Sequence, residues 1–195
     1  PEIMFVKEKD IETRWSGFTA IGIGPGLGER SKLLSKLFSL ESKPLLLDAD
    51  ALNFLSQNPE LQSEIPNNAV ITPHMKEFDR LFGDSESWWD RLQLAKRKAK
   101  ELQIIIVLKN RYTFIAVPNG HVYINPTGNP AMASGGMGDA LSGIITAFLA
   151  QSYSPEQAAI LGCYVHGRAG DLLESEGMAV IPASRLIEKI PFVLG

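Results

Sequence analysis

The sequence predicts an α/β protein with a mostly parallel central sheet, helices on both faces and a β-hairpin near residues 112–124. Short apolar runs rich in β-branched residues alternate with longer amphipathic stretches, which is typical of alternating strands and helices. Nearly every residue of each predicted strand is apolar, which indicates that both faces of the sheet are covered. An Asn-Gly pair, a strong turn signal, marks the hairpin.

The predicted elements follow one another in a regular order. The strands lie at residues 18–23, 44–47, 69–71 and 103–108. Helices are predicted where apolar residues recur three and four positions apart, at residues 30–40, 51–56, 75–82 and 87–102. The hairpin joins residues 112–117 to 121–124, and the last third holds two helices, at residues 139–151 and 155–175.

The composition is that of an ordinary globular domain, and we expect one domain over residues 1–195. Hydrophobic residues make up 45% of the chain and charged residues 21%. A net charge of −3 gives no attraction for a polyanion, so no nucleic-acid partner is expected. A single cysteine, Cys163, excludes a disulfide framework. No apolar run approaches the roughly 20 residues that span a bilayer, so we expect no membrane association and a cytoplasmic location.

Polar residues follow each of the four predicted parallel strands, at residues 24–28, 48–50, 72–74 and 109–110. All four segments lie at carboxyl-terminal strand ends. In open α/β sheets ligands bind outside that edge. The sequence therefore predicts one ligand site there.

The glycine cluster at residues 135–138 precedes a helix and the carboxylate of Asp139. Glycines allow main-chain N–H groups to converge, and a helix N-terminus carries about half a positive charge, so this turn is suited to phosphate. Asp139 would accept a proton from a substrate hydroxyl as that oxygen attacks phosphorus. The alternative is an ordinary glycine turn with a capping aspartate.

The earlier glycine loop matches neither common nucleotide motif. Gly22, Gly24, Gly26 and Gly28 alternate, but the spacing is not that of the dinucleotide fingerprint, and no Gly-Lys-Ser/Thr sequence is present. A Rossmann-type NAD site is therefore not predicted.

Several side chains near the predicted site have both a functional and a structural interpretation. Asp48 and Asp50 would hold Mg²⁺ through water or cap the following helix. Lys109 would reach a phosphate or end a strand. His74 is a candidate hydrogen-bonding group of a pocket, whereas His166 is expected to be a satisfied core histidine.

Taken together, these residues resemble the NAD(P)H-hydrate dehydratase family of the ribokinase-like superfamily. The resemblance runs from Gly22 to the C-terminus, and Asp-Ala-Asp-Ala-Leu-Asn and Thr-Gly-Asn-Pro are peculiar to this family among its relatives. The motifs, in the order of the family, are Gly24-Pro25-Gly26-Leu27-Gly28, Leu47-Asp48-Ala49-Asp50-Ala51-Leu52-Asn53, Ile71-Thr72-Pro73-His74, Val107-Leu108-Lys109, and Asn125-Pro126-Thr127-Gly128-Asn129-Pro130 followed by Gly135-Gly136-Met137-Gly138-Asp139.

The resemblance implies an enzyme that uses ADP or ATP, with Mg²⁺, to dehydrate hydrated NAD(P)H to NAD(P)H and so repair nicotinamide nucleotides. Phosphorylation of the ring hydroxyl would create a leaving group, and elimination would restore the dihydropyridine. Family members often form tetramers, so a homo-oligomer is expected by analogy.

The resemblance also implies roles for individual residues. The catalytic acid/base would be Asp139. Contacts to the nucleotide are expected from Lys109, Asn110, Arg111, Tyr112, Thr113, Gly135, Gly136 and Gly138. Contacts to the hydrate are expected from Gly26, Gly28, His74, Asn129 and Asp139, and the phosphate and metal region would hold Asp48, Asp50, Asn53 and Glu77.

The chain departs from the family pattern at two places. Met75-Lys76-Glu77 stands where the family has Pro-Gly-Glu, which affects the expected geometry of Glu77, and Asn110 replaces a glycine. Asparagine tolerates a left-handed backbone, so the second change is mild. Family domains also begin earlier, so we expect a single ribokinase-like domain without its N-terminal portion.

Two other functions fit the same residues. One is a ribokinase-like kinase of a small vitamin-precursor alcohol, since the glycine cluster and Asp139 would serve that chemistry equally. The other is a non-catalytic nucleotide-binding module.

Overall fold

A computed structural model describes residues 13–28, 32–39 and 43–195, and its centre is one six-stranded sheet in the order β1-β2-β3-β4-β5-β6. The strands are β1 (Ile21–Ile23), β2 (Leu45–Leu47), β3 (Val70–Ile71), β4 (Ile105–Leu108), β5 (Thr113–Ala116) and β6 (Val122–Asn125). Neighbouring strands from β1 to β4 are parallel, and β5 and β6 add an antiparallel hairpin. The predicted mostly parallel sheet and its hairpin are confirmed.

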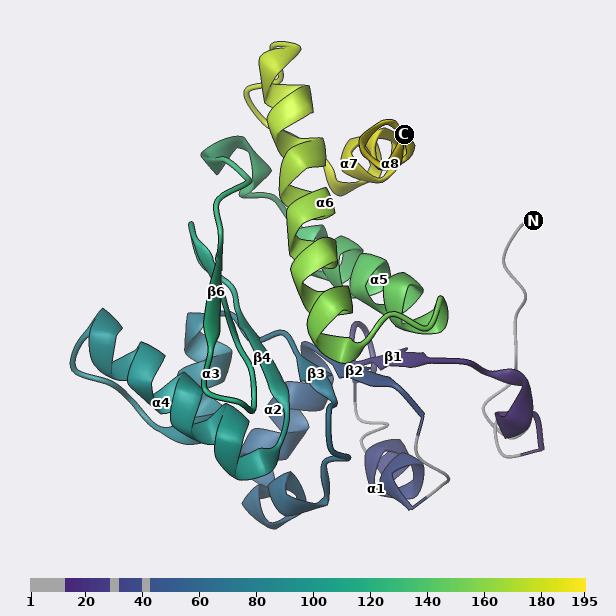
Figure 1. The fold of residues 1–195 in the computed structure, drawn as a ribbon, viewed down its shortest axis with the longest axis vertical. Helices are drawn as coiled ribbons and strands as arrows, with labels where there is room; N and C mark the ends of the chain where they lie inside the picture. Colours follow the sequence, from purple (N-terminus) through teal and green to yellow (C-terminus); the bar gives the residue numbers. More distant parts are fainter. Residues whose placement is uncertain (1–12, 29–31, 40–42) are drawn as a thin grey trace.

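Helices cover both faces of this sheet (Figure 1). One layer contains α1 (Lys32–Phe38), α2 (Asp50–Gln57), α3 (Met75–Phe82) and α4 (Trp88–Leu102). The other contains α5 (Met137–Ala150), α6 (Pro155–Ser175), α7 (Ala183–Lys189) and α8 (Pro191–Leu194). Parallel strands in sequential order place their right-handed crossovers on one face. The opposite face of the sheet is therefore left for the C-terminal helices.

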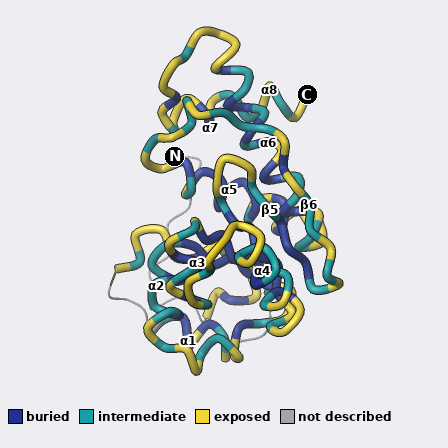
Figure 2. Tube along the Cα trace, turned by 90° about the vertical axis from the view of Figure 1, so that its left-hand side faces the viewer, coloured by how far each residue is buried: buried dark blue, intermediate teal, exposed yellow. Residues whose placement is uncertain are grey.

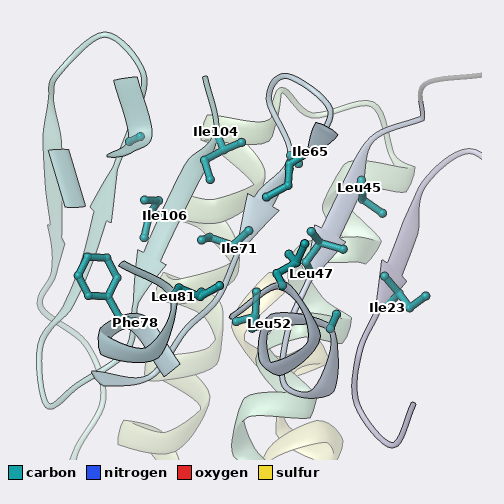
Figure 3. Close-up of a cluster of buried hydrophobic side chains, with 14 of the residues drawn as sticks. Ile23, Leu45, Leu47, Leu52, Ile65, Ile71, Phe78, Leu81, Ile104 and Ile106 are labelled. Carbon is teal, nitrogen blue, oxygen red and sulfur yellow. The ribbon is translucent and has the colours of Figure 1, made fainter. Parts of the chain in front are cut away.

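The all-apolar strands divide their side chains between two cores. Leu45 and Leu47 point to the layer of α1–α4, whereas Leu46 between them packs with α5 and α6. Figure 3 shows the first core, in which Phe78 and Leu52 lie against the strands. Burial along the trace follows the same pattern, with exposed segments on the outside of both helix layers (Figure 2).

Some boundaries differ from the sequence prediction for local reasons. Gln103 caps α4 in the left-handed region (φ 54°), so β4 starts two residues later than expected. The helix predicted from Asp139 begins at Met137, which places Gly138 and Asp139 in its first turn. The ends of the helix predicted at 30–40 fall outside the described residues. The short C-terminal helices α7 and α8 were not predicted.

The longest helix that the structure describes, α6, has 21 residues, but no described helix combines the length and apolarity needed to cross a membrane.

The first core predicts a large effect of truncating Phe78, which is fully buried. We expect Phe78→Ala to lower the free energy of unfolding by about 3–5 kcal/mol, because it loses apolar burial and leaves a cavity. Chemical denaturation measures this loss. The matched control is Phe192→Ala: Phe192 is 74% exposed, so its truncation should change stability by less than about 0.5 kcal/mol. Equal effects of the two changes would contradict this packing.

Candidate functional site

The carboxyl ends of the parallel strands meet at one edge of the sheet. Lys109, just after β4, forms a parallel bridge with His74, which follows β3. Gly24 passes so close to Asp48 that a Cβ on Gly24 would lie 1.7 Å from the Asp48 carbonyl oxygen, and its φ is 137°. Only glycine accommodates both features, so the loop after β1 is held directly against the loop after β2.

The centre of this edge is a buried ion pair. The Asp48 side chain is almost completely buried, and its Oδ1 accepts a hydrogen bond from Lys109 Nζ at 2.9 Å. Its Oδ2 accepts from Ser142 Oγ on α5 at 2.7 Å. The Ser142 hydroxyl also lies 3.3 Å from Thr72 Oγ1. Because both carboxylate oxygens are bonded, Asp48 fixes Lys109 relative to α5.

The N-terminus of α5 lies against this ion pair. A Cβ on Gly138 would lie 3.3 Å from Lys109 Nζ and 3.8 Å from Asp48 Oδ2. Gly136, which precedes the helix, has a φ of 83°. The first N–H groups of a helix have no intrahelical acceptor. With the ammonium of Lys109 close by, this point is suited to an anionic group.

A pocket of about 500 Å³ opens beside Lys109 and Gly138. Its wall combines the end of β4, the hairpin, the 125–133 segment and the facing sides of α5 and α6. Five of the predicted nucleotide contacts line it: Lys109, Asn110, Arg111, Thr113 and Gly138. Tyr112 is half exposed outside it, and Gly135 and Gly136 precede α5 without belonging to its lining.

A second pocket, of about 480 Å³, lies on the other side of the α5 N-terminus. It is lined by the loop after β1, including Gly24 and Gly26, and by Asp139 and Ser142 from α5. Gly138 and Asp139 are adjacent in the chain, yet Gly138 lines the larger pocket and Asp139 the smaller one. The first turn of α5 therefore stands between two cavities.

Asn129 lies in the larger pocket and not with Gly26 in the smaller one. Its Nδ2 donates to Asp171 Oδ1 at 3.0 Å, and Asp171 also accepts from the main-chain N–H of Gly128 at 3.1 Å. A carboxylate on α6 thus holds the 127–130 loop that forms part of the pocket wall.

The other predicted site residues are bonded within the protein and do not line either pocket. His74 and Glu77 form a reciprocal capping box at the start of α3, and neither belongs to the lining of the two pockets. Asn53 Oδ1 accepts from Arg80 at 2.6 Å. Asp50 Oδ2 accepts from the N–H of Gly28 at 2.9 Å. Within the described ranges, no group of three or more His, Cys, Asp or Glu side chains is arranged to hold a metal ion.

His166 and Cys163 also line the larger pocket, although the sequence does not predict a site at these residues. His166 was expected to be a satisfied core histidine, and its Nε2 does lie 3.1 Å from the Met137 carbonyl oxygen. The pKa of His166 is lowered to about 4, mainly by burial; the hydrogen bond to Met137 opposes this lowering, and the Lys109 ammonium adds to it. Burial also raises the pKa of the Cys163 thiol to about 12. Their helical spacing puts both on one face of α6, but spacing alone does not indicate a cavity.

The lowered pKa of His166 predicts a pH dependence of stability. The unfolded chain binds a proton near pH 6.5 and the folded protein only near pH 4, so between these values unfolding takes up a proton and stability falls as the pH falls. This group alone would account for a loss of up to about 3 kcal/mol across that window. Urea denaturation as a function of pH measures it. In His166→Gln the free energy of unfolding should fall less steeply between pH 6.5 and pH 4. An unchanged dependence on pH would contradict the assignment to His166.

Solved structures of known proteins share this architecture. A ribokinase-like superfamily protein from Enterococcus faecalis is 32% identical, with a TM-score of 0.78 over 89% of this chain and 62% of that one. The ADP/ATP-dependent NAD(P)H-hydrate dehydratase of Bacillus subtilis, co-crystallized with ATP/Mg²⁺, is 34% identical, with a TM-score of 0.79 over 90% of this chain and 64% of that one. The sheet, the helix layers and these similarities define an α/β protein of the ribokinase-like class.

Within that class, the chain belongs to the NAD(P)H-hydrate dehydratase family, whose sequence model matches residues 3–192. The bifunctional NAD(P)H-hydrate repair enzyme of Moorella thermoacetica is 41% identical over 180 residues, which are 89% of this chain and 34% of that enzyme. The ADP-dependent (S)-NAD(P)H-hydrate dehydratase of Neisseria meningitidis is 34% identical over 95% of this chain and 68% of its own length. The chain thus spans about a third of the bifunctional relative.

Proposed function

We propose that this chain uses ADP or ATP to dehydrate hydrated NAD(P)H to NAD(P)H. The observation that carries the proposal is the division at the start of α5, where Gly138 opens on one pocket and Asp139 on the other. Transfer of a phosphoryl group needs two ligands that meet at one point. A nucleotide in the larger pocket and the hydrated nicotinamide in the smaller one would meet there.

The phosphate end of the nucleotide would be bound by a positively charged side chain and by main-chain N–H donors. Lys109 is kept beside Gly138 by its ion pair with Asp48. Its ammonium and the first N–H groups of α5 would stabilise the terminal phosphate as negative charge develops during transfer. The carboxylate of Asp48 is engaged with Lys109 and Ser142, so we assign Asp48 a positioning role rather than direct phosphate or metal contact.

Asp139 would act as the base. Its carboxylate lies in the first turn of α5, at an exposed position of the smaller pocket. It would take the proton of the ring hydroxyl while that oxygen attacks the terminal phosphorus. Breaking the carbon–oxygen bond would then expel phosphate, and loss of a proton from the neighbouring carbon would restore the double bond. With ADP as donor, AMP is the second product.

Mg²⁺ fits this site as a partner of the nucleotide. The metal commonly binds through one or two carboxylates, waters and substrate phosphates rather than through an all-protein cage, so a single protein carboxylate would suffice to hold it. Asp50, bonded through Oδ2 to Gly28, is the carboxylate that we assign to it, through water. The ion would neutralise phosphate charge.

Replacing Asp139 tests the role of its carboxylate. We expect Asp139→Asn to lower kcat by about 10²–10⁴-fold and to leave ADP binding nearly unchanged, because the amide cannot accept the proton. Recovery of NADH absorbance from its hydrate measures turnover. The control Asp84→Asn makes the same chemical change at an exposed position outside both pockets. Full turnover by Asp139→Asn would remove Asp139 from the mechanism.

Replacing Lys109 tests the phosphate end of the larger pocket. We expect Lys109→Met to weaken ADP binding by about 10- to 100-fold through loss of a charge-assisted hydrogen bond, with little change for adenosine, which has no phosphate. Titration calorimetry with both ligands gives the comparison. An equal loss for adenosine would place Lys109 away from the phosphates.

The competing kinase function differs from the dehydratase function in the substrate that it would act on. Phosphorylation of free small alcohols, with no action on hydrated NADH, would overturn the dehydratase. Assembly into a homo-oligomer stays a prediction.

A further inference from the structure

We infer that His166 is a specificity-determining residue of the larger pocket, where its ring Nδ1 accepts a hydrogen bond from the nucleoside, either from a ribose hydroxyl or from the adenine amino group. The inference rests on the proposed function for the identity of the ligand. His166 lies on α6 and lines the pocket together with Gly138 and Gly167.

The tautomer follows from the partner of the other ring nitrogen. Nε2 of His166 lies 3.1 Å from the carbonyl oxygen of Met137. A carbonyl oxygen only accepts, so Nε2 carries the hydrogen. A neutral imidazole has one N–H, and Nδ1 therefore presents a lone pair. No residue in the described part of the chain forms a hydrogen bond with Nδ1.

The surroundings keep the ring neutral. The charged side chains that line the pocket are Lys109 and Arg111, both cationic, and its described lining contains no carboxylate. A second proton on His166 would have no counter-charge there. The lowered pKa of the ring, about 4, agrees with this arrangement. The ligand must therefore bring the hydrogen to Nδ1.

Neighbouring polar groups on this side of the pocket are already paired. Asn125 donates to the carbonyl oxygens of Thr127 and Cys163, and its Oδ1 accepts from Thr127 Oγ1. Asn129 is held by Asp171 and by the N–H of Ala131. Nδ1 of His166 is thus an acceptor on α6 that has no described hydrogen-bond partner. The charged groups of the same pocket, in contrast, are hydrogen-bond donors.

A panel of nucleotides tests this inference on the purified protein. Calorimetry would compare ADP with 2′-deoxy-ADP, 3′-deoxy-ADP and purine riboside 5′-diphosphate, each of which lacks one candidate donor. We expect one analogue to bind about tenfold more weakly than ADP. In His166→Leu that difference should disappear. The matched control is Cys163→Ala, one turn earlier in the same pocket wall, which should affect all four ligands alike and keep the difference.

Nitrogen NMR of the wild-type ring provides a readout that needs no variant. ADP should shift the unprotonated Nδ1 resonance toward the hydrogen-bonded range, and the weak analogue should not. A protonated Nδ1 in the complex, equal binding of all analogues, or a difference that persists in His166→Leu would overturn the inference while leaving the proposed function intact. If wild-type protein binds neither ADP nor ATP, the proposed function fails and the inference with it.

Discussion

A carboxylate that is almost completely buried, as in Asp48, is stable only when it is paired and hydrogen-bonded. Lys109 and Ser142 provide these partners from β4 and from α5. The bond to Lys109 ties the loops after β2 and β4 together at the sheet edge, and the bond to Ser142 joins that edge to α5 in the second helix layer. The position of the Lys109 ammonium beside Gly138 depends on the first bond, and the placement of the α5 N-terminus between the two pockets depends on the second.

The division between the pockets explains why the proposed mechanism assigns different roles to two adjacent residues, Gly138 and Asp139. Successive side chains of a helix point about 100° apart, so the first turn of α5 can face two cavities at once. Gly138, without a side chain, leaves room for the Lys109 ammonium, and Asp139 lines the smaller pocket together with the loop that contains Gly24. A phosphoryl group would cross between the ligands at this turn. The larger pocket also depends on α6, because Asp171 holds the loop that contains Gly128.

Much of the candidate site could be predicted from local sequence. The carboxyl-edge rule located Gly26, Asp48 and Lys109, and the glycine cluster indicated the start of α5 and its neighbouring Asp139. His166, in contrast, was predicted to be a core residue, because its spacing on α6 is that of a packed face. Whether such a face meets another helix or a cavity depends on the 125–133 segment, which approaches from a distant part of the chain. Asn129 was predicted to contact the hydrate together with Gly26, but it lines the larger pocket. The reason is again a distant contact, because Asp171 sets the position of its loop.

The sequence alone determined the mostly parallel sheet, its hairpin and the order of the helices as far as α6, because hydrophobic periodicity and turn residues act over a few positions. It also determined which strand ends carry polar groups. The tertiary structure decided which of these groups meet. The ion pair of Asp48 and Lys109 spans 61 positions, and the neutral ring of His166 results from burial beside Lys109. Such pairings depend on how the layers pack, and a pattern of neighbouring residues does not predict contacts between residues so far apart in the sequence.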